Sequence, residues 1–359
     1  MRKPRVLYFY PAKSSFVQKD AMMMAAEFEV LEFEFTVRSK PLLVFVMLRQ
    51  FFFLLVNSRN ARLSVVQFGG YQSLLPALFH KLLGLPCLII AGGTDCVAYP
   101  SIGYGAFANK RMRWFLFKSY KWATHISPVH DSLWKSTNTY YVSDLTEQGI
   151  KSFIPNLATP HTVIANGYDS NSWSAYGERD FNLLVTVAAG LDEKRRRKLK
   201  GIDLITAMAA NFPDKQFMII GGMGHFKTDL PNVIVYGNME QEELKNCFRR
   251  AGFYLQLSIS EGFPNALCEA MLCGCIPIVS NVAAMPMIIG DSGFILEKYD
   301  AELLGQIIML TENNDLHALS FKARERIKTE FPEVRRKIEL TQLMNSLIVK
   351  ASLHEINQL

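Results

Sequence analysis

Two glutamates, Glu261 and Glu269, stand eight positions apart in the stretch "SISEGFPNALCEAMLCGCIPIVSN" at residues 258–281. Pro264 and Asn265 suit the first positions of a helix. Free amides at a helix start attract anions, and phosphate is the usual one. Glu269 is expected about one turn into that helix, where its carboxylate could accept hydrogen bonds from a ribose diol beside a bound phosphate. Glu261 is expected in the loop before the helix, facing the group beyond the phosphates.

The same two acids also fit a purely electrostatic role. Carboxylates near the positive end of a helix dipole stabilise the helix, typically by less than about 1 kcal/mol each. The residues alone leave both interpretations open.

The elements around these glutamates alternate between short apolar runs and helical patterns. In the first half of the chain, "RVLYFYP" (5–11), "LSVVQFGG" (63–70) and "PCLIIAGG" (86–93) are typical of buried strands. In the second half the pattern restarts at 181–190, 215–222, 231–237, 251–258 and 275–281. This alternation predicts an α/β fold with doubly wound parallel sheets. Ligands of such sheets bind beyond the carboxyl ends of the strands.

The length of 359 residues predicts two domains, because a single core rarely keeps growing to that size. A polar, Asn/Gly/Ser-rich stretch, "VIANGYDSNSW" (163–173), lies between the two patterns. We therefore expect an N-terminal domain at 1–168, a C-terminal domain at 169–335, and a helical tail at 336–359 that packs back on the first domain. The cleft between the domains is the expected ligand site.

Composition excludes several classes of protein. The net charge of +6 is a mild basic excess, and the run "KRRRKLK" lacks interleaved aromatic residues, so nucleic-acid binding is not indicated. The cysteines form no C-x-x-C pair and have no histidine at zinc-ligand spacing, so we interpret them as small buried residues in a reducing compartment. These six are Cys87, Cys96, Cys247, Cys268, Cys273 and Cys275.

Two segments suggest contact with a membrane. "PLLVFVMLRQFFFLLVN" (41–57) is the most hydrophobic segment. Arg49 interrupts it, and at about sixteen residues it falls short of the roughly 20 that are needed to span a bilayer, so we expect a buried or membrane-leaning helix. "YGAFANKRMRWFLFKSYKW" (104–122) carries five basic residues and no acidic one, with aromatic residues at helical spacing. Such a helix could lie on an anionic bilayer, or it could be a surface helix with its aromatic face in the core.

The E-x7-E pattern of Glu261 and Glu269, with its "EGFPNALCEAM" context, resembles the signature of the GT-B fold retaining glycosyltransferases of family 4, the glycosyl transferases group 1 family. Further matches follow in the family's order: "VIANGYD" (163–169), "KGIDLITAM" (200–208), "FMIIGGMG" (217–224) and "VIVYGNMEQEEL" (233–244). The resemblance is specific over about 163–300 and weak before residue 160.

This resemblance implies roles for individual residues. Lys200 matches the lysine on the donor diphosphate, a position that suits its flexible point charge. Glu269 matches the glutamate on the ribose, and Glu261 the glutamate near the donor sugar and the reaction centre. The remaining implied donor-binding positions are Gly262 and Phe263 under the sugar, Asn265, Ala266 and Leu267 with amides on the diphosphate, and Gly222, Tyr236, Gly237, Asn238 and Met239 near the base.

The chain departs from the family pattern at several places. Leu191 stands where the family often has the arginine that contacts the diphosphate, and Arg195, Arg196 or Arg197 could replace it or simply lie in a solvated loop. At the amino end, "PAKSSFVQKD" (11–20) replaces a Gly-Gly loop, so that Ser14 and Ser15 are the candidate donor contacts there. Where many members have a histidine the chain has Gly92 and Gly93, and Asp95 beyond them fits either a catalytic residue or a cap on the next segment.

Together these observations predict a GT-B glycosyltransferase that moves a sugar from a nucleoside diphosphate donor, UDP ahead of GDP, to an acceptor hydroxyl with retention. The acceptor is expected to be a glycan or a lipid-linked molecule in cell-surface polysaccharide or glycolipid synthesis. The chain has no D-x-D triplet, so neither a metal nor another cofactor is expected. A cytoplasmic location, peripheral to a membrane, is expected. The alternatives are a sugar-nucleotide epimerase of the same architecture and an inactive nucleotide-sugar-binding subunit.

Overall fold

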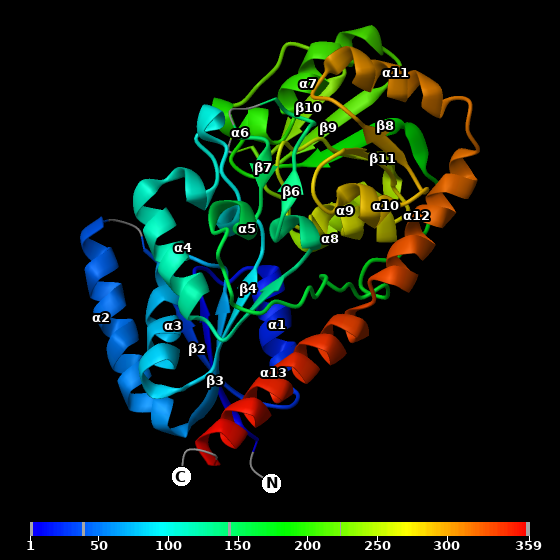
Figure 1. Cartoon of the computed structure of the whole chain (residues 1–359). Helices are drawn as coiled ribbons and strands as arrows, with labels where there is room; N and C mark the ends of the chain where they lie inside the picture. Colours follow the sequence, from blue (N-terminus) through cyan, green and yellow to red (C-terminus); the bar gives the residue numbers. More distant parts are fainter. Residues whose placement is uncertain (1–2, 38–39, 143–144, 223, 357–359) are drawn as a thin grey trace. The chain divides into compact units, whose positions relative to one another are not determined.

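The computed structural model describes residues 3–37, 40–142, 145–222 and 224–356. The chain forms two compact units (Figure 1). Unit 1 comprises residues 1–136, 147–165 and 334–359, and unit 2 comprises residues 137–146 and 166–333. The chain leaves unit 1 between Ala165 and Asn166, inside the polar stretch 163–173. The segment 137–146 belongs to unit 2, although it lies within the range expected for the N-terminal domain.

Unit 1 is built on a five-stranded sheet in the order β2-β1-β3-β4-β5, and all its strand pairs are parallel. The inner strands β1 and β4 are almost fully buried because helices cover both faces of the sheet, whereas the edge strand β2 mixes acidic and apolar residues. Helices α2, α3 and α4 lie together on one face, and α1 and α13 on the other (Figure 1). The elements are β1 (Arg5–Tyr10), α1 (Ser15–Ala25), β2 (Glu29–Glu34), α2 (Lys40–Asn57), β3 (Ala61–Gln67), α3 (Tyr71–Leu83), β4 (Cys87–Ala91), α4 (Lys110–Trp122), β5 (His125–Pro128), α5 (Ile150–Phe153) and α13 (Glu333–Ile356).

A buried ion pair attaches the C-terminal helix to unit 1. Arg336 on α13 donates from Nε and Nη2 to the two carboxylate oxygens of Asp20 on α1, at 2.8 and 2.7 Å. Its Nη1 donates to the backbone carbonyls of Ile164 and Ala165. Both charged side chains are almost fully buried, so removing either one alone would leave an uncompensated charge in the core.

Unit 2 is built on a six-stranded parallel sheet in the order β10-β9-β8-β11-β12-β13. Helices α7 and α11 pack together over one face, and α8, α9, α10 and α12 over the other (Figure 1). The elements are β8 (Asp180–Val187), α6 (Lys194–Leu199), α7 (Ile202–Met208), β9 (Gln216–Ile220), β10 (Val233–Tyr236), α8 (Gln241–Arg250), β11 (Ala251–Gln256), α9 (Asn265–Leu272), β12 (Ile276–Ser280), α10 (Met285–Ile289), β13 (Phe294–Leu296), α11 (Ala301–Thr311) and α12 (Leu316–Glu330). Short strands β6 (Ser136–Thr137) and β7 (Glu147–Gln148) flank the segment 137–146.

Strand order changes direction between β8 and β11 in unit 2, because β9 and β10 lie on one side of β8 while β11 to β13 lie on the other. The loops after two such neighbouring strands diverge to opposite faces of the sheet and leave a crevice at their carboxyl ends. Fold topology alone therefore marks the segments after β8 and β11 as the place for a ligand in unit 2. These segments contain Lys200 and Glu261.

The structure corrects two expectations about the segments with membrane character. The helix expected over 104–122 begins only at Lys110, because the chain turns sharply at Gly105, whose φ is +91° and whose Cβ position would lie 2.2 Å from the Val97 carbonyl oxygen. The apolar segment forms α2 with 18 residues, and the window Pro41–Asn60 is long and apolar enough to cross a membrane by length and composition alone. The expectation that it is too short is therefore wrong on length.

Candidate active site

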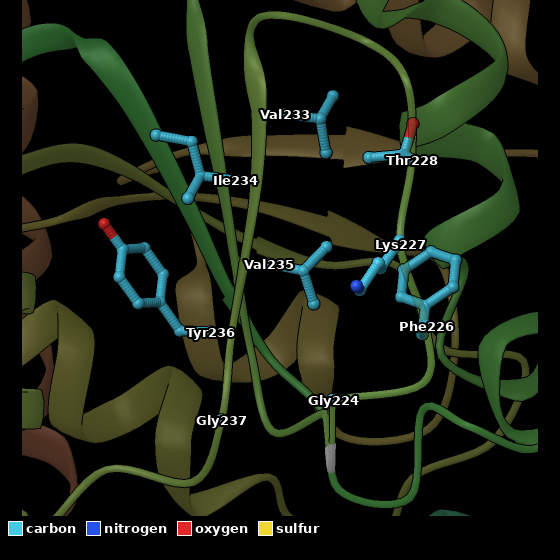
Figure 2. Close-up of a pocket in the computed structure, with 9 residues that line it drawn as sticks. All are labelled: Gly224, Phe226, Lys227, Thr228, Val233, Ile234, Val235, Tyr236 and Gly237. Carbon is cyan, nitrogen blue, oxygen red and sulfur yellow. The ribbon is translucent and has the colours of Figure 1, made fainter.

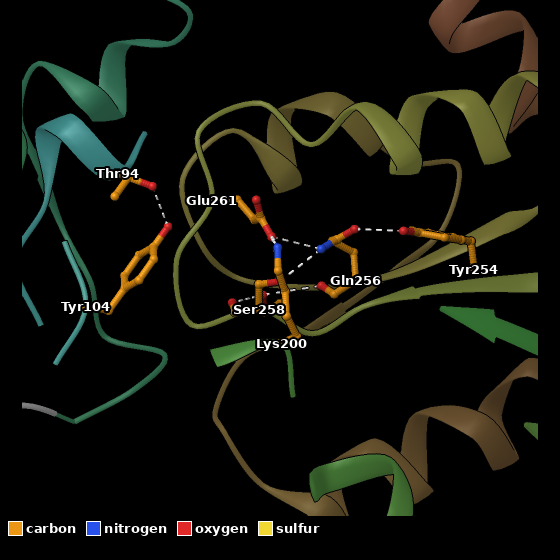
Figure 3. Close-up of polar contacts among 8 residues, drawn as sticks. Thr94, Tyr104, Lys200, Tyr254, Gln256, Ser258 and Glu261 are labelled. Carbon is orange, nitrogen blue, oxygen red and sulfur yellow. Dashed lines mark hydrogen bonds and ion pairs between the residues drawn. The ribbon is translucent and has the colours of Figure 1, made fainter. Parts of the chain in front are cut away.

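Glu261 is anchored by a chain of buried polar side chains that begins inside β11. Tyr254 donates to Gln256 Oε1 at 3.0 Å, and Gln256 Nε2 donates to Ser258 Oγ at 2.9 Å and to Glu261 Oε1 at 3.0 Å. Ser258 Oγ also donates to Glu261 Oε1, at 2.7 Å (Figure 3). Residues 254, 256 and 258 point to one side of an extended segment because side chains alternate along a strand. The alternation of polar and apolar residues in "YLQLS" (254–258) is the sequence signal of this network of side chains.

Lys200 completes the contacts of the same carboxylate oxygen. Its Nζ forms an ion pair with Glu261 Oε1, and the two side chains are 22% and 15% exposed. Glu261 Oε1 thus receives three donors. Among the residues that the structure describes, none donates to Glu261 Oε2, so this oxygen can accept a hydrogen bond from a ligand hydroxyl. An ammonium group has three N–H donors, so Lys200 can keep Glu261 and still bind an anion.

Position 201, directly after Lys200, must be a glycine. Its φ is +69°, and a Cβ at this position would lie 2.5 Å from the Leu257 carbonyl oxygen. The backbone amide of Ile259 donates to the Leu199 carbonyl at 2.8 Å, so the segment before α7 runs against the segment after β11. Only glycine permits this approach, and the approach is what brings Lys200 to Glu261.

The start of α9 is held by two residues of the segment that links the units along the chain. Tyr168 OH donates to Asn265 Oδ1 at 2.8 Å, and Asn166 Nδ2 donates to the same oxygen at 3.2 Å. Burial raises the pKa of the Tyr168 hydroxyl well above its ordinary value, which keeps it protonated as a donor. The first-turn amides of the helix, including those of Ala266 and Leu267, have no carbonyl partner within the helix. They are therefore suited to an anion.

The other predicted residues of this segment lie as follows. Glu269 lies on α9, one turn after Asn265, and its side chain is partly exposed. Phe263 is buried, and its ring packs on those of Tyr168 and Phe331. The predicted role of this residue is a backbone one, in the turn under the donor sugar. Gly262 is buried in the same turn.

Three arginines were candidates to replace the arginine missing at Leu191, which is itself fully buried in the core. Arg197 Nη1 donates to the carbonyls of Leu191 and Asp192, and its guanidinium lies over the ring of Phe226. Arg195 pairs with Glu193 at 3.3 Å on the surface. For the Arg196 guanidinium, no hydrogen bond or ion pair is found among the described residues, and its aliphatic part lies against Gly190.

The residues predicted near the nucleotide base lie at the β9–β10 side of the sheet. The amide of Gly222 donates to the Tyr236 carbonyl. Gly237 and Asn238 are exposed. The sulfur of Met239 lies 3.6 Å from the Cys247 thiol. A pocket of about 320 Å³ runs along β10 (Figure 2). Gly237 lines this pocket, and sequence reasoning missed the aromatic and basic side chains that line it opposite the strand, Phe226 and Lys227.

Asp95 in unit 1 does not fit the predicted catalytic role. It is 4% exposed, and its Oδ2 accepts from the Gly69 amide and the Tyr120 hydroxyl, at 2.8 and 2.9 Å. Its Oδ1 accepts from the amides of Gly92 and Gly93, at 3.1 and 2.9 Å. Both oxygens are used to hold loops together. The alternative interpretation, a structural cap, is the one that these contacts favour.

The glycine at position 92 also has a structural reason. A Cβ there would lie 2.0 Å from the ring of Phe68, a residue with the unusual φ of +65° that follows β3. A histidine side chain could not occupy position 92 unless this ring moved. Ser14 precedes α1 at its N-cap position, and its buried Oγ has no hydrogen-bond partner among the described residues, whereas Ser15 is exposed.

No group of three or more His, Cys, Asp or Glu side chains suited to a metal ion occurs within the described part of the chain. All six cysteines are free, and five of them are buried. Burial raises the pKa of the Cys273 thiol to about 11 and that of Cys275 to about 12, which makes them inert small core residues.

Parts of the chain are similar to known proteins. Residues 193–330 match the family model described as glycosyl transferases group 1. The O-antigen chain mannosyltransferase B of Escherichia coli is 29% identical over 79 residues, which are 22% of this chain and 21% of that protein. The shared region is therefore only about a fifth of that relative.

Solved structures resemble the chain over nearly its whole length. Sucrose-phosphate synthase of Thermosynechococcus elongatus matches with a TM-score of 0.75 and 14% identity, over 96% of this chain and 100% of that one. HepE of Anabaena in complex with UDP matches with a TM-score of 0.67 and 12% identity, over 95% and 100%. The fold is GT-B, with two Rossmann-like domains. The matched residues 193–330 lie in unit 2, so it is this unit that resembles the glycosyl transferases group 1 family.

Proposed function

We propose that the chain transfers a sugar, with retention of anomeric configuration, from a nucleoside diphosphate donor to an acceptor hydroxyl. The observation that carries this proposal is the contact of Lys200 with Glu261 Oε1 after β8 and β11, with Glu261 Oε2 open to a ligand. The arrangement supplies an ammonium group for phosphate and a fixed carboxylate oxygen for a sugar hydroxyl. The free amides at the start of α9 add donors for the second phosphate.

In the proposed reaction, the bond between the anomeric carbon and the diphosphate oxygen breaks while the acceptor oxygen bonds to the same face of that carbon. The acceptor proton passes to the leaving phosphate oxygen. Negative charge develops on the departing diphosphate, so Lys200 and the α9 amides would lower the barrier by stabilising that charge. We further propose that these groups act without a metal ion. Unchanged turnover after treatment with EDTA would support this.

UDP is the proposed carrier, ahead of GDP. The support is the family resemblance of the donor-binding segment and the likeness in fold to HepE, whose solved structure is a complex with UDP. The partial similarity to an O-antigen chain mannosyltransferase supports an acceptor in cell-surface polysaccharide or glycolipid synthesis. A cytoplasmic location is also proposed, since six free cysteines suit a reducing compartment.

A thermal-shift panel of UDP, GDP, ADP and their common sugars tests the donor, because a ligand that binds only the folded state raises the unfolding temperature. We expect the largest shift with UDP or a UDP-sugar. A shift with GDP alone would replace UDP by GDP. The selected donor is then incubated with glycan and lipid-linked acceptors, and NMR of the product reports the anomeric configuration. An inverted product contradicts retention, and an epimerised sugar from donor alone would favour the epimerase.

A further inference from the structure

Helix α2 is apolar on the face that it turns to solvent. The side chains of this outer face are 37–75% exposed. They recur at the spacing of one helical stripe. The members of this outer stripe are Val44, Phe45, Leu48, Phe51, Phe52, Leu55 and Val56.

The opposite face of α2 is tied to unit 1. Phe53 packs on the rings of Phe9 and Phe33, and Gln50, fully buried, donates to the Gln72 carbonyl at 2.8 Å. Arg49 donates to the Glu34 carbonyl. These contacts fix which side of the helix faces outward. A helix that is apolar on both faces is usually covered on both faces. We therefore expect an apolar surface outside unit 1 to cover the outer stripe.

Basic side chains extend the same surface. Helices α2, α3 and α4 lie side by side, with α3 in the middle (Figure 1). None of these three helices contains an aspartate or a glutamate. On α4, Lys110 and Arg111 are exposed beside the exposed rings of Trp114 and Phe117. At the end of α3, Leu82 and Leu83 are exposed next to Lys81.

We propose that the outer surface of α2, α3 and α4 binds the surface of an anionic lipid bilayer, with the outer stripe of α2 inserted among the acyl chains near the headgroups. The apolar stripe matches the acyl chains of such a bilayer, and the basic side chains, with no acidic ones on these helices, match its anionic headgroups. Trp114 suits the interface because the amphipathic ring of tryptophan settles at the headgroup level, and Phe117 adds an apolar contact. Since the buried face of α2 contributes to the core of unit 1, the helix would lie in the membrane plane.

Vesicle flotation of the full chain tests this surface without any donor or acceptor, so its result does not depend on the proposed transferase reaction. We expect binding to vesicles of phosphatidylcholine with phosphatidylglycerol, weaker binding to phosphatidylcholine alone, and weaker binding at high salt. The double variant Phe45→Ser/Phe52→Ser should reduce partitioning by roughly tenfold or more, because two large apolar side chains are lost from the inserted stripe. Met309→Ser/Phe321→Ser, which alters exposed apolar side chains of unit 2, is the matched control and should bind like wild type.

The cations are tested separately. Lys110→Glu/Arg111→Glu should abolish the preference for anionic vesicles, whereas Arg250→Glu/Lys328→Glu, which reverses two exposed charges on unit 2, should not. Thermal unfolding of each variant checks that it is folded. If Phe45→Ser/Phe52→Ser does not fold, Lys110→Glu/Arg111→Glu still tests whether this surface binds anionic vesicles.

Three results would overturn the proposal. The first is that wild type does not bind anionic vesicles. The second is that Phe45→Ser/Phe52→Ser turns a dimer into a monomer in sedimentation without changing vesicle binding, which would assign the stripe to a second copy of the chain. The third is that bound protein resists extraction by alkaline carbonate, which would make α2 a membrane-spanning helix.

Discussion

The ion pair between Lys200 and Glu261 joins the segments that follow β8 and β11, the two strands at which the order of the unit 2 sheet reverses. It occupies one carboxylate oxygen only. The hydroxyl and amide donors from Ser258 and Gln256 converge on that same oxygen, so the orientation of the carboxylate is fixed by three contacts. A fixed carboxylate with one open oxygen is suited to orient a sugar hydroxyl.

Substitution of Glu261 should therefore affect turnover more than nucleotide binding. In Glu261→Gln the side chain keeps its shape but loses the charge that pairs with Lys200. We expect kcat to fall roughly tenfold to a hundredfold, as for loss of one preorganised electrostatic contact, with a smaller change in the dissociation constant for the free nucleotide. Glu302→Gln, an exposed position on α11, is the control. Equal losses in both quantities would place Glu261 on the nucleotide.

The predicted role of Glu269 can be tested with modified nucleotides. Loss of hydrogen bonds to a charged acceptor costs about 1.5–3 kcal/mol, so Glu269→Ala should weaken nucleotide binding roughly tenfold or more. The wild type should distinguish the nucleotide from its 2′,3′-dideoxy analogue by a similar factor, and the variant should not. If the variant keeps that discrimination in calorimetric titration, Glu269 does not bind the ribose.

Arg196 is the arginine that we expect to contact the diphosphate. It lies on α6 between Arg195, which pairs with Glu193, and Arg197, whose guanidinium is held by two backbone carbonyls. Arg196→Gln should therefore weaken nucleoside diphosphate binding about fivefold to a hundredfold, the range for a charge-assisted contact, while leaving binding of the nucleoside unchanged.

Arg195→Gln is the matched control for that experiment and should bind the diphosphate like wild type. Arg197→Gln should lower the unfolding temperature instead, because it removes contacts to the Leu191 and Asp192 carbonyls. A diphosphate defect in Arg195→Gln with none in Arg196→Gln would reverse the assignment.

Much of the fold was accessible from the sequence because the strands are buried on both faces. Runs such as "RVLYFYP" and "CIPIVSN" are mostly apolar, end at proline or asparagine, and both form the expected strands. The helix of "NALCEAML" also forms, but it begins at Asn265, and Pro264, predicted in its first turn, is the N-cap residue. Local composition decides such elements, so no knowledge of tertiary contacts was needed.

Roles that depend on tertiary contacts were less accessible. Asp95 was a candidate for catalysis by its position after a strand, but only the fold brings the Gly69 amide and Tyr120 hydroxyl to its carboxylate. The choice among three consecutive arginines depended on which backbone carbonyls lie near each guanidinium. The turn at Gly105, which precedes α4, lies so close to the Val97 carbonyl that a Cβ would clash, and only the fold shows this approach.

The structural role of Asp95 has a direct test. Asp95→Asn replaces an acceptor of four amide and hydroxyl hydrogen bonds by a group that cannot accept them all. We expect the free energy of unfolding in urea to fall by roughly 1.5–3 kcal/mol, with an unchanged nucleotide affinity for the folded protein. Asp131→Asn, at an exposed position, should leave stability unchanged. A catalytic Asp95 would give the opposite result, with turnover lost and stability kept.

His125 on β5 should make the stability of the protein depend on pH. Its Nε2 lies 3.0 Å from Thr162 Oγ1, and burial, followed by the nearby charges of His161 and Lys350, lowers the pKa of the imidazole to about 4. An unfolded histidine has a pKa of about 6.5, so between about pH 6.5 and 4 the unfolded state binds the proton that the folded state does not. The stabilising contribution of the neutral ring is complete above that range and is lost as the pH falls through it.

His80 and His130 also have lowered pKa values, so the measurement compares the wild type with His125→Gln. The difference between their unfolding temperatures should shrink as the pH falls through this range, and a difference that stays constant would show that His125 is not the group that titrates.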